Sequence, residues 1–123
     1  MEGAFRDSRY GNAIAAFNRG EWYRCHDLLE ALWHEAIEPE ATFLQGLLQL
    51  AVAMLHQQRG NRRGATILLG EALGRLSHYR EDSYGGVDMT ALKHSVEGWL
   101  LECQQGGDGC AMALPVLRPC KGC

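Results

Sequence analysis

The chain has 123 residues, a formal net charge of −3 at pH 7, and 46% hydrophobic and 22% charged residues. This length predicts one domain that can bury a core without disulfides or metal, and the composition is that of an ordinary globular protein. The acidic balance argues against non-specific nucleic-acid binding, which needs a basic surface.

Three features predict a cytoplasmic protein without a membrane segment. The N-terminal sequence MEGAFRDSRYGN lacks the basic start and apolar run of a secretory signal. The longest apolar stretch is interrupted by Gln49 and ends at His56, so it is too short and too polar to span a membrane. The five cysteines cannot all pair within one chain, which favours free thiols in a reducing compartment.

Apolar periodicity predicts five helices, at about residues 8–18, 21–36, 40–59, 62–79 and 89–103. Gly20 is expected to end the first helix, and Asn61 and Asp88 are expected to cap the fourth and fifth. No run alternates with a period of two, so no sheet is expected. Short connections favour antiparallel neighbours. The predicted fold class is therefore all-α, a single irregular array of about five amphipathic helices.

The chain is expected to divide into a helical domain, residues 1–105, and an irregular cysteine-containing tail, residues 106–123. No amphipathic stripe lies beyond Gln105, so truncation there is expected to leave the core folded. In the tail, Cys120 and Cys123 have zinc-compatible spacing, with Cys110 upstream. A closed zinc site needs four ligands, and only His94 or Cys103 offers a fourth, which favours incidental thiols.

The third expected helix carries a polar stripe opposite a broad apolar arc. Gln45, Gln49, Val52 and His56 form this stripe, which is the pattern of a solvent-facing surface. However, residues 41–55 include no charged side chain, and the residues beside the stripe are small. Small residues next to amides indicate a surface that another element or molecule approaches closely.

The second expected helix places a histidine and a carboxylate among apolar residues. His26, Glu30, Trp33 and Ile37 share one line, beside Trp22 and Leu29. An unpaired buried carboxylate costs several kcal/mol or takes up a proton. We therefore expect Glu30 and His26 to be mostly buried and bonded to each other, or to the third helix's polar stripe across a helix–helix seam. Such a cluster is either a structural network or a small-ligand or metal site.

Four short motifs resemble those of a known family. They are Phe17-Asn18-x-Gly20, His26-x3-Glu30-x2-Trp33, Gln45-Gly46-x2-Gln49-x-Ala51 and Gly60-Asn61-x2-Gly64-Ala65. With this set, residues 13–77 resemble the bacterial, archaeal and plant-plastid proteins catalogued as domain of unknown function 309. The resemblance implies an all-helical fold and no established activity. The candidate ligand-binding or structural polar cluster is His26, Glu30, Trp33, Gln45, Gln49, His56 and Asn61.

Three functions fit the sequence, and none of them assigns a reaction or a cofactor. The preferred one is a helical binding or interaction module for a small ligand or protein partner, in which the polar cluster fixes the conformation. The second is a metal- or small-ligand-binding enzyme using His26, Glu30 and His56, although di-iron bundles use several carboxylates. The third is an anion or nucleic-acid binder at the Arg59–Arg63 turn, where the amino end of a helix would attract an anion.

Overall fold

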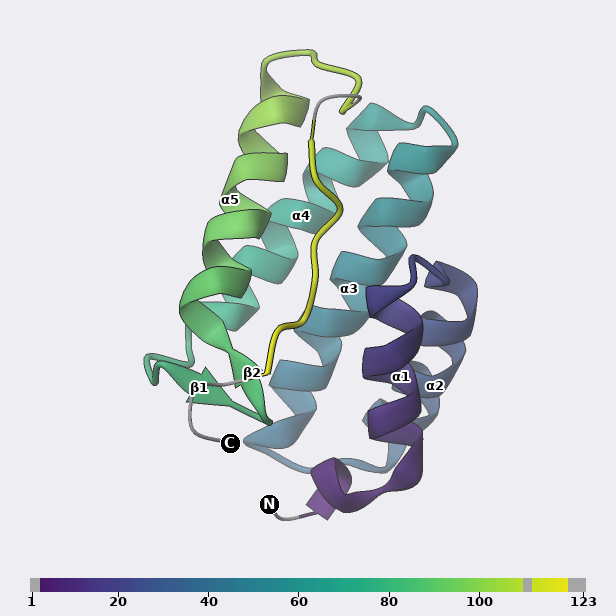
Figure 1. The fold of residues 1–123 in the computed structure, drawn as a ribbon, viewed down its shortest axis with the longest axis vertical. Helices are drawn as coiled ribbons and strands as arrows, with labels where there is room; N and C mark the ends of the chain where they lie inside the picture. The colour runs from purple at the N-terminus through teal and green to yellow at the C-terminus, as the bar shows by residue number, and fades with distance from the viewer. Residues whose placement is uncertain (1–2, 110–111, 120–123) are drawn as a thin grey trace.

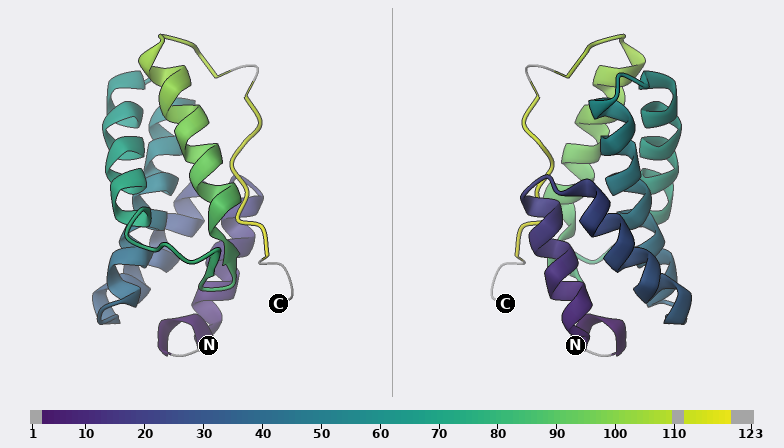
Figure 2. Two further views of the ribbon diagram at one scale, coloured as in Figure 1. Left: turned by 90° about the vertical axis from the view of Figure 1, so that its left-hand side faces the viewer. Right: turned by 90° about the vertical axis from the view of Figure 1, so that its right-hand side faces the viewer.

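Five α-helices form an antiparallel array in the computed structural model, which describes residues 3–109 and 112–119 (Figure 1). Figure 2 shows the same array from its two sides, with α1 and α2 covering only the lower part of the longer helices. A short 3-10 helix, η1 (Gly3–Arg6), precedes α1. The helices are α1 (Ser8–Asn18), α2 (Trp22–Glu35), α3 (Glu40–Gln58), α4 (Arg62–Leu76) and α5 (Met89–Gln104). The predicted all-α fold is confirmed.

Local side-chain chemistry sets the ends of these helices. At the start of α4, the Asn61 side chain accepts the N–H of Gly64 at 3.0 Å. At the start of α5, the Asp88 side chain accepts the N–H of Ala91 at 3.0 Å. Gly20 follows α1 with φ +72°, the left-handed conformation that ends many helices. The two predicted caps and the predicted stop are confirmed.

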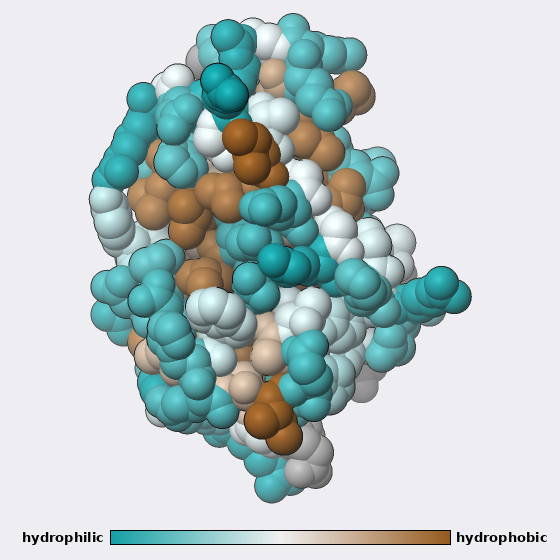
Figure 3. Space-filling model, turned by 180° about the vertical axis from the view of Figure 1, so that it is seen from behind, coloured by the Kyte–Doolittle hydropathy of each residue, from teal (hydrophilic) through white to brown (hydrophobic). Residues whose placement is uncertain are grey.

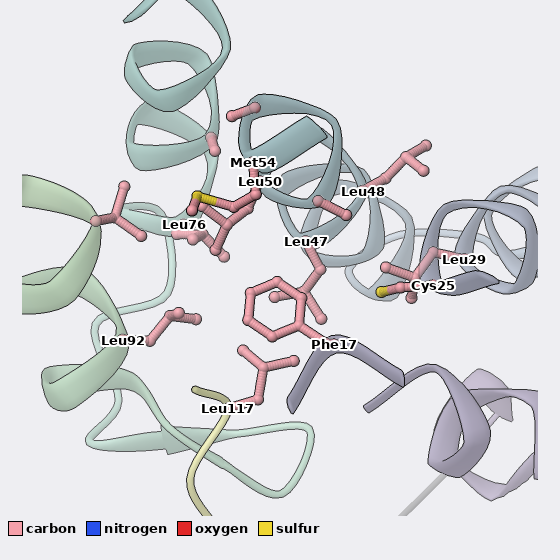
Figure 4. Close-up of a cluster of buried hydrophobic side chains, with 14 of the residues drawn as sticks. Phe17, Cys25, Leu29, Leu47, Leu48, Leu50, Met54, Leu76, Leu92 and Leu117 are labelled. Carbon is pink, nitrogen blue, oxygen red and sulfur yellow. The ribbon is translucent and has the colours of Figure 1, made fainter. Parts of the chain in front are cut away.

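Helix α3 is the central helix and packs between α2 and α4. Its leucines and Met54 meet side chains from α1, α2, α4, α5 and the tail in the core cluster of Figure 4. The closest approach is to α4: a Cβ on Gly46 would lie 3.1 Å from Cδ2 of the fully buried Leu76. The small residues beside the polar stripe therefore accommodate α4.

One β-hairpin corrects the expectation that the chain has no sheet. Strands β1 (Ser83–Tyr84) and β2 (Val87–Asp88) pair antiparallel around Gly85 and Gly86. Both glycines have positive φ, +56° and +77°, as a two-residue type I′ turn requires. Strands of two residues are too short to show alternation in a sequence, so periodicity alone missed them.

The described part of the tail, residues 112–119, is irregular, as expected, but it is not separate from the core. It runs along the front of the molecule between α1 and α5 (Figure 1). Leu117 is 2% exposed and lies near Phe17 and Leu92 in Figure 4. Leu117 joins the core cluster although no amphipathic stripe lies beyond Gln105, because a single apolar anchor carries no periodic signal. The expectation that truncation after Gln105 leaves the core folded stays a prediction. The division into domains at residue 105 stays a prediction.

An aromatic cluster closes the lower end of the array. Phe5 of η1 lies 4.9 Å from Tyr10 and 5.5 Å from Tyr84, measured between ring centroids. Phe43 of α3 lies 4.9 Å from Tyr84 and 5.5 Å from Tyr79. The cluster thus joins η1, α1, α3, the residues after α4, and β1. Within the described part of the chain, we find no helix with the length and apolar character needed to cross a membrane.

Candidate functional site

His26 and Glu30 form an ion pair on the outer side of α2. His26 Nε2 lies 3.1 Å from Glu30 Oε2, one helical turn along. The side chains remain accessible, with exposed fractions of 29% for His26 and 46% for Glu30. The predicted contact between the two residues is therefore present, at the surface of the helix.

The pair is partly buried at the edge of the core, and its role stays a prediction. Helix α2 buries a neighbouring line instead, formed by Trp22, Cys25, Leu29 and Leu32. Trp33 is half-buried at the edge of that line. The second helix ends at Glu35, so Ile37 lies outside it and is 79% exposed. Two overlapping apolar lines exist on α2, and packing against α1 and α3 selects the one that lacks charged groups.

The imidazole of His26 lies between two carboxylates. Its Nδ1 is 3.2 Å from Asp27 Oδ1, on the side of the ring opposite Glu30. A protonated ring donates to both carboxylates, whereas a neutral ring donates to only one. His34 Nε2 approaches the other Glu30 oxygen at 4.0 Å. The arrangement presents an imidazole and two carboxylates to a partner.

The polar stripe of α3 is half-buried. Its hydrogen bonds described below are with α4 and with the residue that caps α4. Gln49 Nε2 donates to Glu71 Oε2 of α4 over a long 3.4 Å, while Gln49 Oε1 is buried with no partner among the described residues. The recorded hydrogen bonds of this stripe thus run to α4 and its cap, and those of His26 and Glu30 run within α2.

His56 and Asn61 together build the turn between α3 and α4. Asn61 Oδ1 accepts the Gly64 N–H, which orients its amide so that Nδ2 donates to His56 Nδ1 at 2.9 Å. A Cβ on Gly64 would lie 2.7 Å from Asn61 Nδ2 and 3.0 Å from the His56 ring. Gly60 supplies the positive φ, +75°, that ends α3. This part of the predicted cluster therefore organises a turn.

The proposed metal ligands His26, Glu30 and His56 are not assembled into a site. Among the residues that the structure describes, no three or more His, Cys, Asp or Glu side chains are grouped as a metal ion needs. Cys110, Cys120 and Cys123 lie outside the described residues. Cys103 is a buried free thiol whose pKa is raised by burial.

The arginines of the 59–63 turn do not converge on one point. Arg59 reaches back to α2, where its guanidinium lies 5.2 Å from the Tyr23 ring centroid and donates to the Tyr23 hydroxyl. Arg62 and Arg63 are exposed and border a hollow of about 530 Å³ with Thr66, Ile67, Cys103 and Gln104. Arg59 thus stacks on Tyr23, whereas Arg62 and Arg63 lie exposed at the start of α4.

A clamp around Arg9 escaped sequence reasoning. Arg9 donates two hydrogen bonds to the Glu35 carboxylate, of 2.8 and 3.0 Å, and three to Asp7, so it ties the start of α1 to the end of α2. The hydrogen bonds from Arg9 lower the pKa of Asp7 to about 2 and also lower the pKa of Glu35. Residues 26 apart with one charge each give no local pattern, so no sequence signal marks this pair.

The fold and these motifs define a small all-helical domain, and comparison with known proteins shows which proteins it is similar to. The model of the family described as a domain of unknown function, DUF309, matches residues 10–68, just under half of the chain. The uncharacterised protein YpuF of Bacillus subtilis (strain 168) is similar, with 31% identity over 86 residues, or 69% of this chain. The matched region covers 45% of YpuF, so the chain spans less than half of that relative. The predicted family resemblance is confirmed.

Proposed function

We propose that this domain is a protein-binding module and that its binding surface is the outer line of α2 formed by His26, Glu30 and Trp33. The observation that carries the proposal is the accessible His26–Glu30 pair itself. A solvent-accessible pair at this spacing on a helix contributes only about 0.3–0.5 kcal/mol to stability. The contribution to stability therefore does not account for a histidine and a glutamate at these positions, whereas a binding role would.

The other family motifs have structural roles that account for their residues. Gly46 admits Leu76 of α4, Gly64 admits His56, and Ala51 and Ala65 are fully buried. Phe17 is fully buried as well. The His26-x3-Glu30-x2-Trp33 motif differs, because its two ionisable side chains face solvent. This contrast supports assigning the binding role to α2.

The chemistry of this surface suits a protein partner. Trp33 supplies a half-buried aromatic ring, the residue type most enriched at binding hot spots. The pair beside it offers a carboxylate and an imidazole for charge-assisted hydrogen bonds. Figure 3 shows one face of the molecule, on which hydrophilic surface surrounds separate apolar areas. A mixed surface of this kind is typical of non-obligate protein interfaces.

Photo-crosslinking tests the proposal. A photo-reactive phenylalanine derivative in place of the exposed His34, one turn from Glu30, should form a covalent adduct of one mass in extract of the cells that make this protein. The same group in place of Ile67, 54% exposed on α4, is the positional control. Glu30→Ala should abolish the adduct, and Glu97→Ala, which changes an exposed glutamate on α5, should leave it intact. Equal adducts from both positions, or adducts that survive Glu30→Ala, would refute the assignment.

A further inference from the structure

Residues 112–119 lie in the structure as an extended peptide held in a groove. They run between α1 and α5 in Figure 1. From residue 114 to residue 118, exposed and buried side chains alternate. Pro115 and Leu117 are buried, whereas Val116 and Leu114 are 39% and 56% exposed. Pro115 and Leu117 are thus the buried side chains of the segment, and Met112 packs partly buried against the core.

The side chain of Asn18, the last residue of α1, hydrogen-bonds both the N–H and the carbonyl of one residue in this segment. Its Nδ2 donates to the Leu117 carbonyl at 3.1 Å, and its Oδ1 accepts the Leu117 N–H at 2.7 Å. A carboxamide that both donates to and accepts from one residue recognises an extended backbone without regard to the side chain. Asn18 belongs to the family segment, residues 10–68, whereas the tail lies outside it.

Two further contacts recognise the backbone of the segment. Trp99 Nε1 of α5 donates to the Ala113 carbonyl at 2.9 Å. The Asp88 N–H of β2 donates to the Arg118 carbonyl at 2.9 Å, beside an antiparallel bridge between Val87 and Pro119. The segment thus adds to the edge of the hairpin, which is a recurrent way for proteins to bind extended peptides.

Specificity comes from the leucine. Leu117 is 2% exposed, and Figure 4 shows it beside Phe17 of α1 and Leu92 of α5, both fully buried. A groove that recognises backbone at several points and one apolar side chain two residues after a proline has the properties of a peptide receptor. This site is separate from the α2 surface and does not depend on its function.

We propose that the groove between α1 and α5 is a receptor for an extended Pro-x-Leu segment of a protein partner, and that residues 112–119 occupy it in cis as an autoinhibitory strap. The tethered strap competes at an effective concentration of about millimolar, so the intact chain binds a free peptide weakly. The partner segment binds in the groove when the strap is weakened or displaced.

The test uses the full-length chain and a fluorescent peptide with the sequence of residues 112–119. Leu117→Ala in the chain weakens the strap, and the peptide should then bind about tenfold or more tightly than to the unchanged chain. Leu114→Ala, which alters an exposed leucine of the same strap, should leave peptide affinity unchanged. Adding Asn18→Ala to the Leu117→Ala chain should weaken binding about tenfold, because both hydrogen bonds to the peptide backbone are lost.

Three results would overturn the proposal. One is no peptide binding by a Leu117→Ala chain that keeps its helical circular dichroism spectrum. Another is equal affinity with and without Asn18. The third is a dimer that exchanges straps between copies, which would make a second copy the occupant.

Hydrogen exchange of the unchanged chain decides the matter if Leu117→Ala does not fold. The Leu117 amide should exchange through a local opening that leaves the Leu47 amide of α3 protected, and excess peptide should accelerate it. Exchange of both amides only by global unfolding would show that the segment is a fixed part of the core.

Discussion

Gly46 and Gly70 offer a matched pair for measuring how closely α3 and α4 must approach. Each lies inside a helix, so alanine should gain about 0.5–1 kcal/mol from helix propensity at either position. A Cβ on Gly70 meets nothing within 4 Å. Gly70→Ala should therefore stabilise the protein by about that amount.

The same substitution at Gly46 should have the opposite sign. The new Cβ would lie 3.1 and 3.2 Å from Cδ2 and Cγ of Leu76 and 3.5 Å from Cβ of Arg75. Carbon atoms pack best at about 3.5–4.0 Å, and Leu76 is fully buried, so the helices must move apart. Overpacking of this kind costs about 1–3 kcal/mol, which leaves Gly46→Ala destabilised by about 0.5–2 kcal/mol after the propensity gain.

Urea denaturation of the two variants beside the unchanged chain measures this difference. The propensity gain is common to both variants, so their free energies of unfolding should differ by the overpacking cost of about 1–3 kcal/mol, with equal m-values. If both alanines stabilise the protein equally, the distance between α3 and α4 is not fixed by Gly46. The packing role assigned to the Gln45-Gly46 motif would then be refuted.

Three further outcomes follow from the described contacts. Glu30→Ala should lower the free energy of unfolding by only about 0.3–0.5 kcal/mol in urea titrations, because the pair with His26 is accessible to solvent; a loss above about 2 kcal/mol would contradict this. The lowered pKa values of Asp7 and Glu35 stabilise the fold above their unfolded values, and this stability should be lost as pH falls from about 4 toward 2. In the Arg9→Gln variant, the urea concentration at the midpoint of unfolding should depend less on pH between about 4 and 2. Burial raises the pKa of the Cys25 thiol to about 12, so peptide mapping should find it unalkylated in the native protein near neutral pH and modified in urea.

The helices were predictable because their signals are local. Asn61 and Asp88 cap the helices that follow them through bonds to residues three positions away, and such spacing is visible in a sequence. The contact of His26 with Glu30 was predictable for the same reason. What a single helix specifies about itself was therefore recovered.

The unpredicted features depend on contacts between distant residues. The sequence of α2 contains two adjacent apolar lines, and only the packing of α1 and α3 decides that Cys25 faces inward and Glu30 outward. Leu117 is one apolar residue in an irregular segment, and its partner Asn18 is 99 residues away. Neither the choice of the buried face of α2 nor the position of the tail produces a periodic pattern in the sequence. The biological role of the predicted polar cluster stays a prediction.

The aromatic cluster at the lower end sets an order in which the chain can complete its fold. Phe5 and Tyr84 are in ring contact across most of the helical sequence, and Phe43 and Tyr79 lie between them. By contrast, α3 and α4 are joined by a short turn whose contacts are local. Local contacts form before distant ones, because closing a long loop costs more entropy. During synthesis the antiparallel pair of α3 and α4 can therefore form early. Phe5 can contact Tyr84 only after the β-hairpin has left the ribosome, so the aromatic cluster is completed later.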